Sequence, residues 1–103
     1  MTIKFDILNR FTDEVIYTAE IDCADDVPFP VKKGLAVKQA AKDGADLIGA
    51  NLTNANLSKA DLSYAWLADA DLVGADLSYA DLRYANLYDA ILRNADLTGV
   101  IRR

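Results

Sequence analysis

The side chains with the most regular chemical spacing are carboxylates and amides that recur every five residues. Between residues 45 and 99, eleven five-residue units follow one another, and nine of them hold Asp or Asn in second place. Such oxygens could bind a hard cation such as Ca²⁺. Neutral Asn alternates freely with Asp, however, and both side chains commonly accept hydrogen bonds from nearby backbone amides in turns. We therefore expect them to close corners of the backbone and predict no metal site.

Residues suited to catalysis are scarce in this chain. It has no histidine, the commonest general base and metal ligand of proteins. Its one cysteine, Cys23, cannot form a disulfide within the chain and is most simply a partly buried thiol. The sequence contains neither a glycine-rich phosphate loop nor a nucleophile elbow. We therefore expect a protein that is not an enzyme and that uses no cofactor.

The charge and hydropathy of the chain limit its partners and its location. The net charge of −5 disfavours direct binding to the phosphates of a nucleic acid. No apolar segment approaches the roughly 18 residues needed to span a bilayer. Charged residues also interrupt the first eleven positions, where a signal peptide would need an apolar run. We expect a cytoplasmic protein without nucleic-acid or membrane partners.

The five-residue period restricts the backbone conformation. Alanine opens all eleven units and leucine is third in all eleven, whereas places four and five vary. On an α-helix, successive leucines would lie about 140° apart around the axis, so no apolar stripe would form. On a flat strand they would point alternately to opposite faces. A backbone that turns one corner per unit keeps Ala and Leu inside, which predicts a solenoid.

Tandem copies of Ala-Asp/Asn-Leu-x-x resemble the motif of the pentapeptide-repeat family over residues 45–99. The resemblance implies a mainly β fold, a right-handed quadrilateral β-helix in which four units form one coil. Residues 45–103 would then form about three coils, with alanine and leucine filling the axis. The chain is also similar to small phage and bacterial members of the family that place a hairpin and a helix before the repeat.

The first 44 residues lack the repeat and are expected to cap the first coil, since a solenoid must cover its apolar end. Alternating apolar residues predict strands over residues 3–9 and 14–23, joined as a β-hairpin. The inner faces are expected to carry Ile3, Phe5 and Ile7 on the first strand and Val15, Tyr17, Ala19 and Ile21 on the second.

A short helix is expected between the hairpin and the repeat. Two prolines make residues 24–30 a loop, because proline fits neither strand nor helix interiors. Residues 31–44 carry apolar residues at a loosely helical spacing and stop at Gly44, a usual residue after a helix end. Gly34 weakens this helix.

Two units break the second-place rule. Trp66 and Ile91 stand where the other units have Asp or Asn, so both are expected to point outward. Trp66 could pack beneath the hairpin or the 24–30 loop, or it could form an exposed binding or dimer patch, since Trp is common at interaction hot spots.

Tyrosines at fourth and fifth places add to the outward surface. Tyr64 and Tyr84 are expected to stack in register, with Tyr79 on the neighbouring face and Tyr88 further round. Such a ladder could be purely structural or could serve recognition. The candidate interaction surface comprises Trp66, Ile91, Tyr64, Tyr79, Tyr84 and Tyr88.

The C-terminal end has no recognisable cap. Arg102 stands where a twelfth leucine would lie, so the last coil is unfinished. Either the arginine-rich tail folds over this end or two copies meet there, and the family resemblance implies dimers of this kind. The residues expected at this end are Leu92, Leu97, Val100 and Ile101.

These features favour a protein-interaction or structural module whose partner is another protein or a second copy. The alternative is a DNA mimic that inhibits or protects DNA gyrase, an activity that the family resemblance brings with it. Eight acidic and five basic side chains leave residues 45–103 at only −3, which argues against mimicry. Three coils are also much shorter than one duplex turn of about 34 Å.

Overall fold

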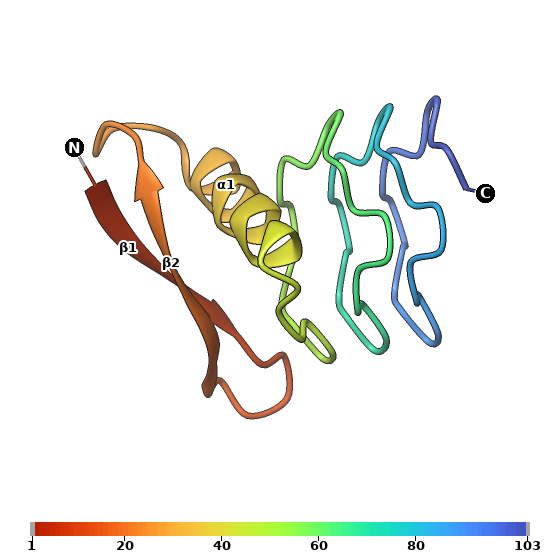
Figure 1. The fold of residues 1–103 in the computed structure, drawn as a ribbon, viewed down its shortest axis with the longest axis horizontal. Coiled ribbons are helices and arrows are strands. Elements are labelled where there is room, and N and C mark those ends of the chain that lie inside the picture. Colours follow the sequence, from red (N-terminus) through yellow and green to blue (C-terminus); the bar gives the residue numbers. More distant parts are fainter. Residues whose placement is uncertain (1, 103) are drawn as a thin grey trace.

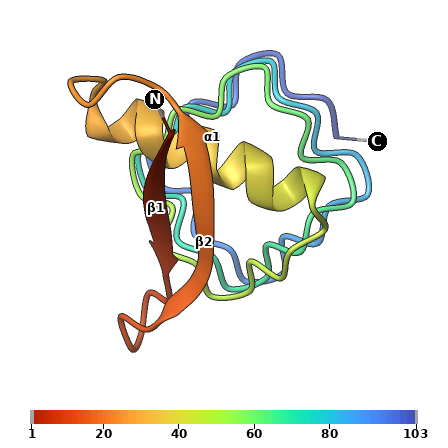
Figure 2. The same ribbon diagram turned by 60° about the vertical axis from the view of Figure 1, so that its left-hand side comes forward.

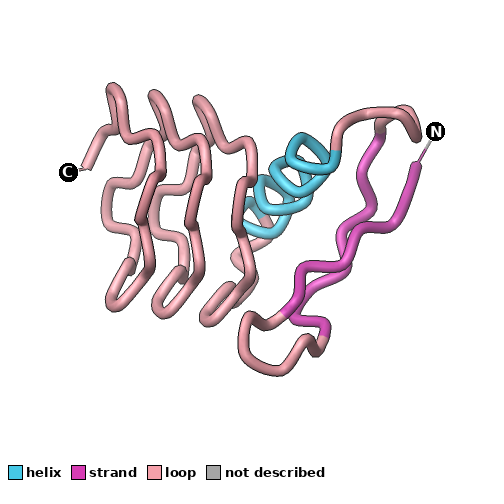
Figure 3. The backbone as a smooth tube through the Cα atoms, turned by 180° about the vertical axis from the view of Figure 1, so that it is seen from behind, coloured by secondary structure: helices cyan, strands magenta, loops and turns pink. Residues whose placement is uncertain are grey.

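The computed structural model describes residues 2–102 and shows a hairpin and a helix followed by stacked coils (Figure 1). Strand β1 (Thr2–Leu8) pairs with strand β2 (Val15–Asp22), and helix α1 (Phe29–Lys42) follows them. From residue 45 to residue 102 the backbone consists of corners joined by short paired steps (Figure 3). The predicted hairpin and helix are therefore both present.

Backbone pairing in the repeat links residues twenty positions apart. Second-place residues form parallel pairs along four columns: Asp46–Trp66–Asn86, Asn51–Asp71–Ile91, Asn56–Asp76–Asp96 and Asp61–Asp81–Ile101. Four units thus separate each residue from its stacked partner, and the chain forms a solenoid as the period predicted.

Backbone hydrogen bonds hold neighbouring coils together. The amide of Leu72 donates to the carbonyl of Ile91 in the next coil at 2.8 Å, and the amide of Asp71 donates to Ala50 in the preceding coil at 2.9 Å. Fifth-place amides make a third bond of this kind. The amides and carbonyls on the edges of each coil therefore find their hydrogen-bond partners in the adjacent coils.

The fifth place of every unit turns the corner. All eleven fifth-place residues have φ between 58° and 73°, the left-handed region that favours Gly and Asn. Bulky residues such as Lys59, Tyr64 and Tyr84 also adopt this conformation. Across each corner the alanine amide donates to the leucine three residues earlier, as from Ala75 to Leu72 at 3.0 Å. The corner is thus a property of the backbone rather than of one residue type.

Leucine and alanine fill the axis, as predicted. The buried leucines are Leu47, Leu52, Leu57, Leu62, Leu67, Leu72, Leu77 and Leu82. In the last coil, Leu87, Leu92 and Leu97 are only partly buried. The core therefore continues without interruption from the helix to the third coil and then opens to solvent.

The hairpin departs from the predicted alternation at one point. Ile7 pairs with Tyr17 and Leu8 with Val15, so Ile16 is an extra residue in β2. A one-residue bulge reverses the side to which later side chains point. Val15 is accordingly 53% exposed, and the prediction that it lies on the inner face was wrong. The other predicted inner residues lie in the core or against it.

Helix α1 begins earlier than the prolines suggested. Phe29 and Pro30 belong to its first turn, so the loop predicted over residues 24–30 ends at Pro28. Proline is tolerated in a first turn because the amides there have no partner within the helix. Gly44 follows the last turn with φ of 71°, as predicted. Within residues 2–102, no helix is long and apolar enough to cross a membrane.

Gly34 is required by packing. It lies in the buried face of α1, and a Cβ at this position would be 1.9 Å from the carbonyl oxygen of Asn56. The backbone of the helix therefore lies directly on the first coil, and Figure 2 shows the helix crossing the end of the solenoid. From the sequence, Gly34 was expected only to weaken the helix, and this contact was not predicted.

Hydrogen bonds attach residues 2–44 to the first coil. The amide of Asn51 donates to Leu8 at 2.8 Å, continuing the hairpin onto the solenoid edge. The ammonium of Lys33 donates to the carbonyl of Thr53 at 2.9 Å, and burial lowers the pKa of Lys33. The N-terminal end of the solenoid is thus covered by polar as well as apolar contacts.

Candidate interaction face

Every Asp or Asn at place two closes its own corner. In all nine units the side-chain Oδ1 accepts a hydrogen bond from the backbone amide two residues later, at 2.9–3.3 Å. The predicted local hydrogen bonding is confirmed. In the described part of the chain, residues 2–102, no group of three or more His, Cys, Asp or Glu side chains could hold a metal ion.

These corner hydrogen bonds favour the charged form of the carboxylates. The hydroxyl of Ser63 donates to Asp61 at 2.6 Å and, with the amide of the same residue, lowers the pKa of Asp61. The guanidinium of Arg83 lies 2.8 Å from Asp81 and lowers the pKa of that carboxyl. A backbone amide lowers the pKa of Asp96 in the same way.

Trp66 and Ile91 cannot make the corner bond, because neither side chain has an acceptor. The amides they leave without a partner are those of Ala68 and Arg93, which have no hydrogen bond to any atom of residues 2–102. Both residues therefore lack a stabilising contact that the other nine units possess.

Trp66 stands on the outside of the second coil, between Asp46 and Asn86 in its column. Its side chain is 52% exposed, so the alternative that it packs beneath the hairpin or the 24–30 loop is wrong. Two shallow hollows flank the indole. One, of about 240 Å³, is lined by Gly44, Asp46 and Ile48, and the other, of about 390 Å³, is lined by Tyr64 and Tyr84.

Five large exposed side chains gather on this side of the rod, and we call them the apolar face. They are Ile48, Tyr64, Trp66, Tyr84 and Tyr88. Tyr64 and Tyr84 stack with ring centroids 5.0 Å apart and planes inclined by 18°, which confirms the predicted register. Ile48 and Tyr88 occupy the fourth places of the first and third coils in the same column. Ile48 was missed, although adding twenty to its number twice leads through Ala68 to Tyr88.

Carboxylates border the apolar face. Asp46 shares the column of Trp66, and Asp69 and Asp89 follow each other at the adjoining corner. The side chains of Asp69 and Asp89 have no hydrogen bond or ion pair with any group of residues 2–102. Arg10 of the hairpin turn reaches this border, where its guanidinium donates to the carbonyl oxygen of Asp69 at 2.9 Å.

Two residues of the predicted surface lie elsewhere. Tyr79 turns a different corner, and its ring covers Gly99, where a Cβ would be 2.4 Å from the ring. Ile91 pairs with Asp71 on the adjacent side and is partly buried. The structure thus brings Trp66 together with Tyr64, Tyr84 and Tyr88 but not with Tyr79 or Ile91.

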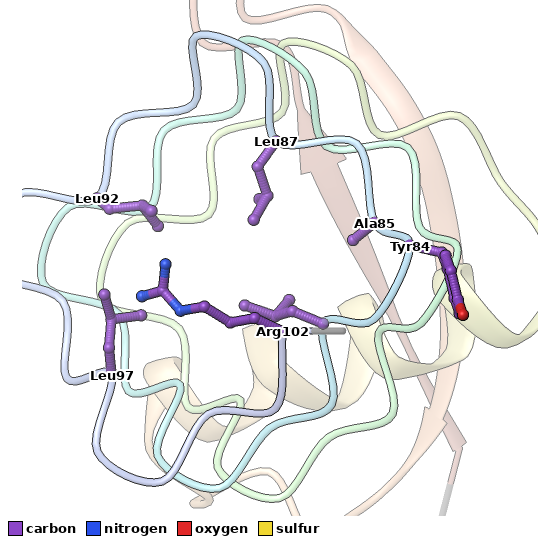
Figure 4. A pocket seen from close by; sticks show the side chains of 7 residues that line it. Tyr84, Ala85, Leu87, Leu92, Leu97 and Arg102 are labelled. Carbon is purple, nitrogen blue, oxygen red and sulfur yellow. The ribbon is translucent and has the colours of Figure 1, made fainter.

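The C-terminal end forms a separate apolar opening, which we call the open end. A hollow of about 390 Å³ is lined by Leu82, Tyr84, Ala85, Leu87, Leu92, Leu97 and Arg102. Figure 4 shows the side chain of Arg102 extending across it toward Leu92 and Leu97. This agrees with the alternative in which the arginine-rich tail folds over the end. Val100 packs against the core at this end, whereas Ile101 occupies an outward second place and is exposed.

The last coil also has unpaired backbone groups. The amides of Leu87, Leu92 and Leu97 have no acceptor among residues 2–102, since the described residues contain no further coil for them to pair with. The predicted end residues Leu92 and Leu97 therefore line an opening that is both apolar and rich in free strand groups.

Comparison with known proteins bears on the repeat. The family model of pentapeptide repeats matches residues 43–72 and 67–99 with eight copies, which together cover more than half of the chain. No curated protein matches the chain. The repeat motif, its twenty-residue pairing and this match lead to one conclusion: the chain belongs to the pentapeptide-repeat family.

Proposed function

We propose that this protein is a non-enzymatic interaction module, in which residues 1–44 cap a right-handed quadrilateral β-helix formed by residues 45–103. The observation that carries the proposal is the apolar face, where five large side chains are exposed on one side of a rigid rod. Contiguous exposed apolar groups typically mark interaction sites, and Trp and Tyr are enriched among hot-spot residues. The partner is a protein in the bacterial or phage-infected cytoplasm.

Affinity capture from a bacterial lysate tests this role. The wild-type chain is immobilised beside Trp66→Asp and the matched variant Ile91→Asp, which makes the same change on the adjacent side. Both variants gain the corner acceptor that the other units have, so both should fold. Proteins retained by the wild type and by Ile91→Asp but lost with Trp66→Asp would support the proposal. A wild-type chain that retains no protein specifically would contradict it.

A second copy bound at the open end is the second candidate for the partner. Its support is the combination of an apolar hollow with unpaired amides in the last coil. Two copies meeting there about a twofold axis would cover both openings at once.

DNA mimicry is the less favoured alternative. The longest dimension of the whole molecule is 36 Å, and this includes the hairpin and helix. A duplex mimic also needs a continuous negative surface, whereas one side of this rod is apolar. We expect no inhibition of gyrase supercoiling at micromolar protein. Inhibition at that concentration, lost when Asp76 and Asp96 are both changed to Asn, would restore this alternative.

A further inference from the structure

We propose that the apolar face binds an extended basic polypeptide segment in which every second residue is in turn apolar and Arg or Lys. This inference rests on the proposed role as an interaction module and specifies both the surface and the chemistry of the partner. It is carried by the exposure of Trp66 and of the two stacked tyrosines, by the shape of the surface around Trp66, and by the sign of the charges beside it.

Trp66 lacks the corner hydrogen bond of the other units, and half of its side chain stays exposed. An Asp or Asn there would accept a hydrogen bond from the amide of Ala68, as happens in nine other units. The indole provides no such acceptor, and it remains 52% exposed. Positions that break a local folding rule without a compensating contact are characteristic of functional sites.

The tyrosines beside Trp66 are also exposed. Tyr64 and Tyr84 turn their corners with φ of 64° and 62°, as Lys59 and Tyr79 do elsewhere, and about two thirds of each side chain is open to solvent. The two rings stack on each other, and their hydroxyls have no hydrogen-bond partner within residues 2–102. The result is a fixed aromatic platform with free polar edges.

The surface around the indole suits alternating side chains. The indole lies between the two hollows, one toward Ile48 and the other toward Tyr64 and Tyr84. Each hollow can accept one apolar side chain of a segment that crosses the indole. In an extended segment every second side chain points to the same side, so a basic residue two positions from each of these apolar residues would lie over an aromatic ring, where a guanidinium or ammonium group is favoured.

The charges select a basic segment over an acidic one. Asp46, Asp69 and Asp89 border the face, and residues 45–49, 65–69 and 85–89 contain no basic residue. Arg83 stands beside Tyr84 but is paired with Asp81. Asp69 and Asp89 occupy the same corner of successive coils and have no ion pair among residues 2–102, so a cation at this border would meet two carboxylates. Arg10 supplies only one opposing charge at this border. The net charge of −5 favours the same partner at long range.

A peptide-binding experiment tests the inference directly. The probe is a fluorescein-labelled peptide with three Leu-Gly-Arg-Gly repeats, which place Leu and Arg in turn on one side of an extended chain. Binding is followed by fluorescence anisotropy, with Trp66 emission as an independent reporter in the wild type. We expect saturable binding that weakens with added salt, and a Trp66 emission that shifts to the blue. Peptides with Glu or Gln in place of Arg serve as the charge controls.

Variants locate the binding surface. Trp66→Asn restores the corner acceptor, so it should fold at least as well as the wild type, yet bind about 30-fold more weakly, as expected for a hot-spot Trp. Asp69→Asn with Asp89→Asn should weaken binding about 5-fold, because two charges at the border are lost while the corner positions receive a favoured residue. The matched control, Asp76→Asn with Asp96→Asn, removes two charges from the polar side of the rod and should leave the affinity unchanged.

Several results would overturn the inference. These are no binding of the Arg peptide by the wild type, equal binding of the Glu or Gln peptide, unchanged affinity of Trp66→Asn, or equal weakening by both double variants. Saturable binding of a neutral oligosaccharide such as maltoheptaose in place of the Arg peptide would also overturn it. If lysate proteins remain bound to Trp66→Asp, the interaction role stands and this face is the wrong surface.

Discussion

Single residues at the corners determine how the rod responds to pH. Hydrogen bonds from Ser63 and from Arg83 hold the pKa values of Asp61 and Asp81 below the ordinary value, and Asp96 is affected in the same way by a backbone amide. A carboxyl whose pKa is lower in the folded state stabilises the fold above its unfolded pKa. That contribution is lost as the pH falls through the folded pKa.

We therefore expect acid to weaken the rod below about pH 4. Changing Asp61, Asp81 and Asp96 together to Asn keeps the corner acceptor and removes the titration. The fall of the thermal midpoint between neutral and acidic pH should be smaller in this triple variant than in the wild type. Asp69→Asn with Asp89→Asn, which changes carboxylates outside the corner bonds, should not reproduce the effect. An equal fall in all three proteins would show that the corner bonds do not determine the acid response.

The core leucines differ in what their loss should cost. Leu72 is fully buried at the centre of the rod, so Leu72→Ala should lower the free energy of unfolding by about 2–5 kcal/mol. Leu97 is partly buried at the open end, so Leu97→Ala should lower the free energy of unfolding by less than Leu72→Ala does. Chemical denaturation followed by circular dichroism measures both values. Equal losses at the two sites would contradict the axial core described above.

At the scale of elements, the contact between α1 and the first coil joins residues 2–44 to the rod. The helix can lie so close because Gly34 has no side chain. Tyr17 of β2 in turn donates a hydrogen bond to Asp43 just beyond the helix at 2.5 Å, and this contact raises the pKa of Tyr17 to about 12. The hairpin therefore contacts the end of the helix, and the helix contacts the first coil.

Gly34→Ala should disturb the contact between α1 and the first coil. Alanine favours helices by about 1 kcal/mol over glycine, yet here its Cβ would clash with the carbonyl of Asn56. We expect the clash to dominate and the thermal midpoint to fall. Gly44→Ala is the matched control, since a Cβ there meets nothing within 4 Å and adds only the strain of a positive φ. A higher midpoint for Gly34→Ala than for the wild type would mean that helix and coil are less closely packed.

The elements show what sequence can and cannot predict. The solenoid and its Leu-Ala core follow from the period, because an exact five-residue repeat excludes helix and flat strand. The bulge at Ile16 was not predictable, because one extra residue in a strand leaves the apolar alternation readable on either side of it. The role of Gly34 depends on the position of one carbonyl in another element.

The apolar face, too, could be predicted from the sequence only in part. Trp66 could be identified because it breaks a rule in the repeat. The grouping of Ile48 with Tyr88 required the twenty-residue register to be applied to fourth places, and the hollows beside the indole depend on how side chains pack. Sequence therefore predicted individual outward residues better than the surface they form.

At the scale of the whole molecule, the two ends of the rod differ. One end is covered by a helix and a hairpin, and the other is the open end, crossed only by Arg102 within residues 2–102. An uncovered apolar cross-section with free strand groups favours association.

We expect a concentration-dependent dimer through the open end. Leu97→Glu would place a charge in that contact and should shift the protein to monomer in sedimentation velocity. Thr98→Glu adds the same charge on the outside of the coil and should leave the dimer intact. Circular dichroism spectra of both variants would verify that the coils are retained. A wild-type protein that stays strictly monomeric at high concentration would remove this candidate.

The twenty-residue register also constrains how such a chain can change its length during evolution. Because every outward residue has its neighbours twenty positions away, an insertion or deletion of twenty residues preserves the composition of each side. A single added unit after Gly74 would instead shift all later residues by a quarter turn. Asn86 would leave the column of Trp66, and Tyr84 would leave that of Tyr64. The Leu-Ala core would accommodate an insertion of twenty residues or of one five-residue unit. Natural selection on the number of units would therefore act through the surface alone.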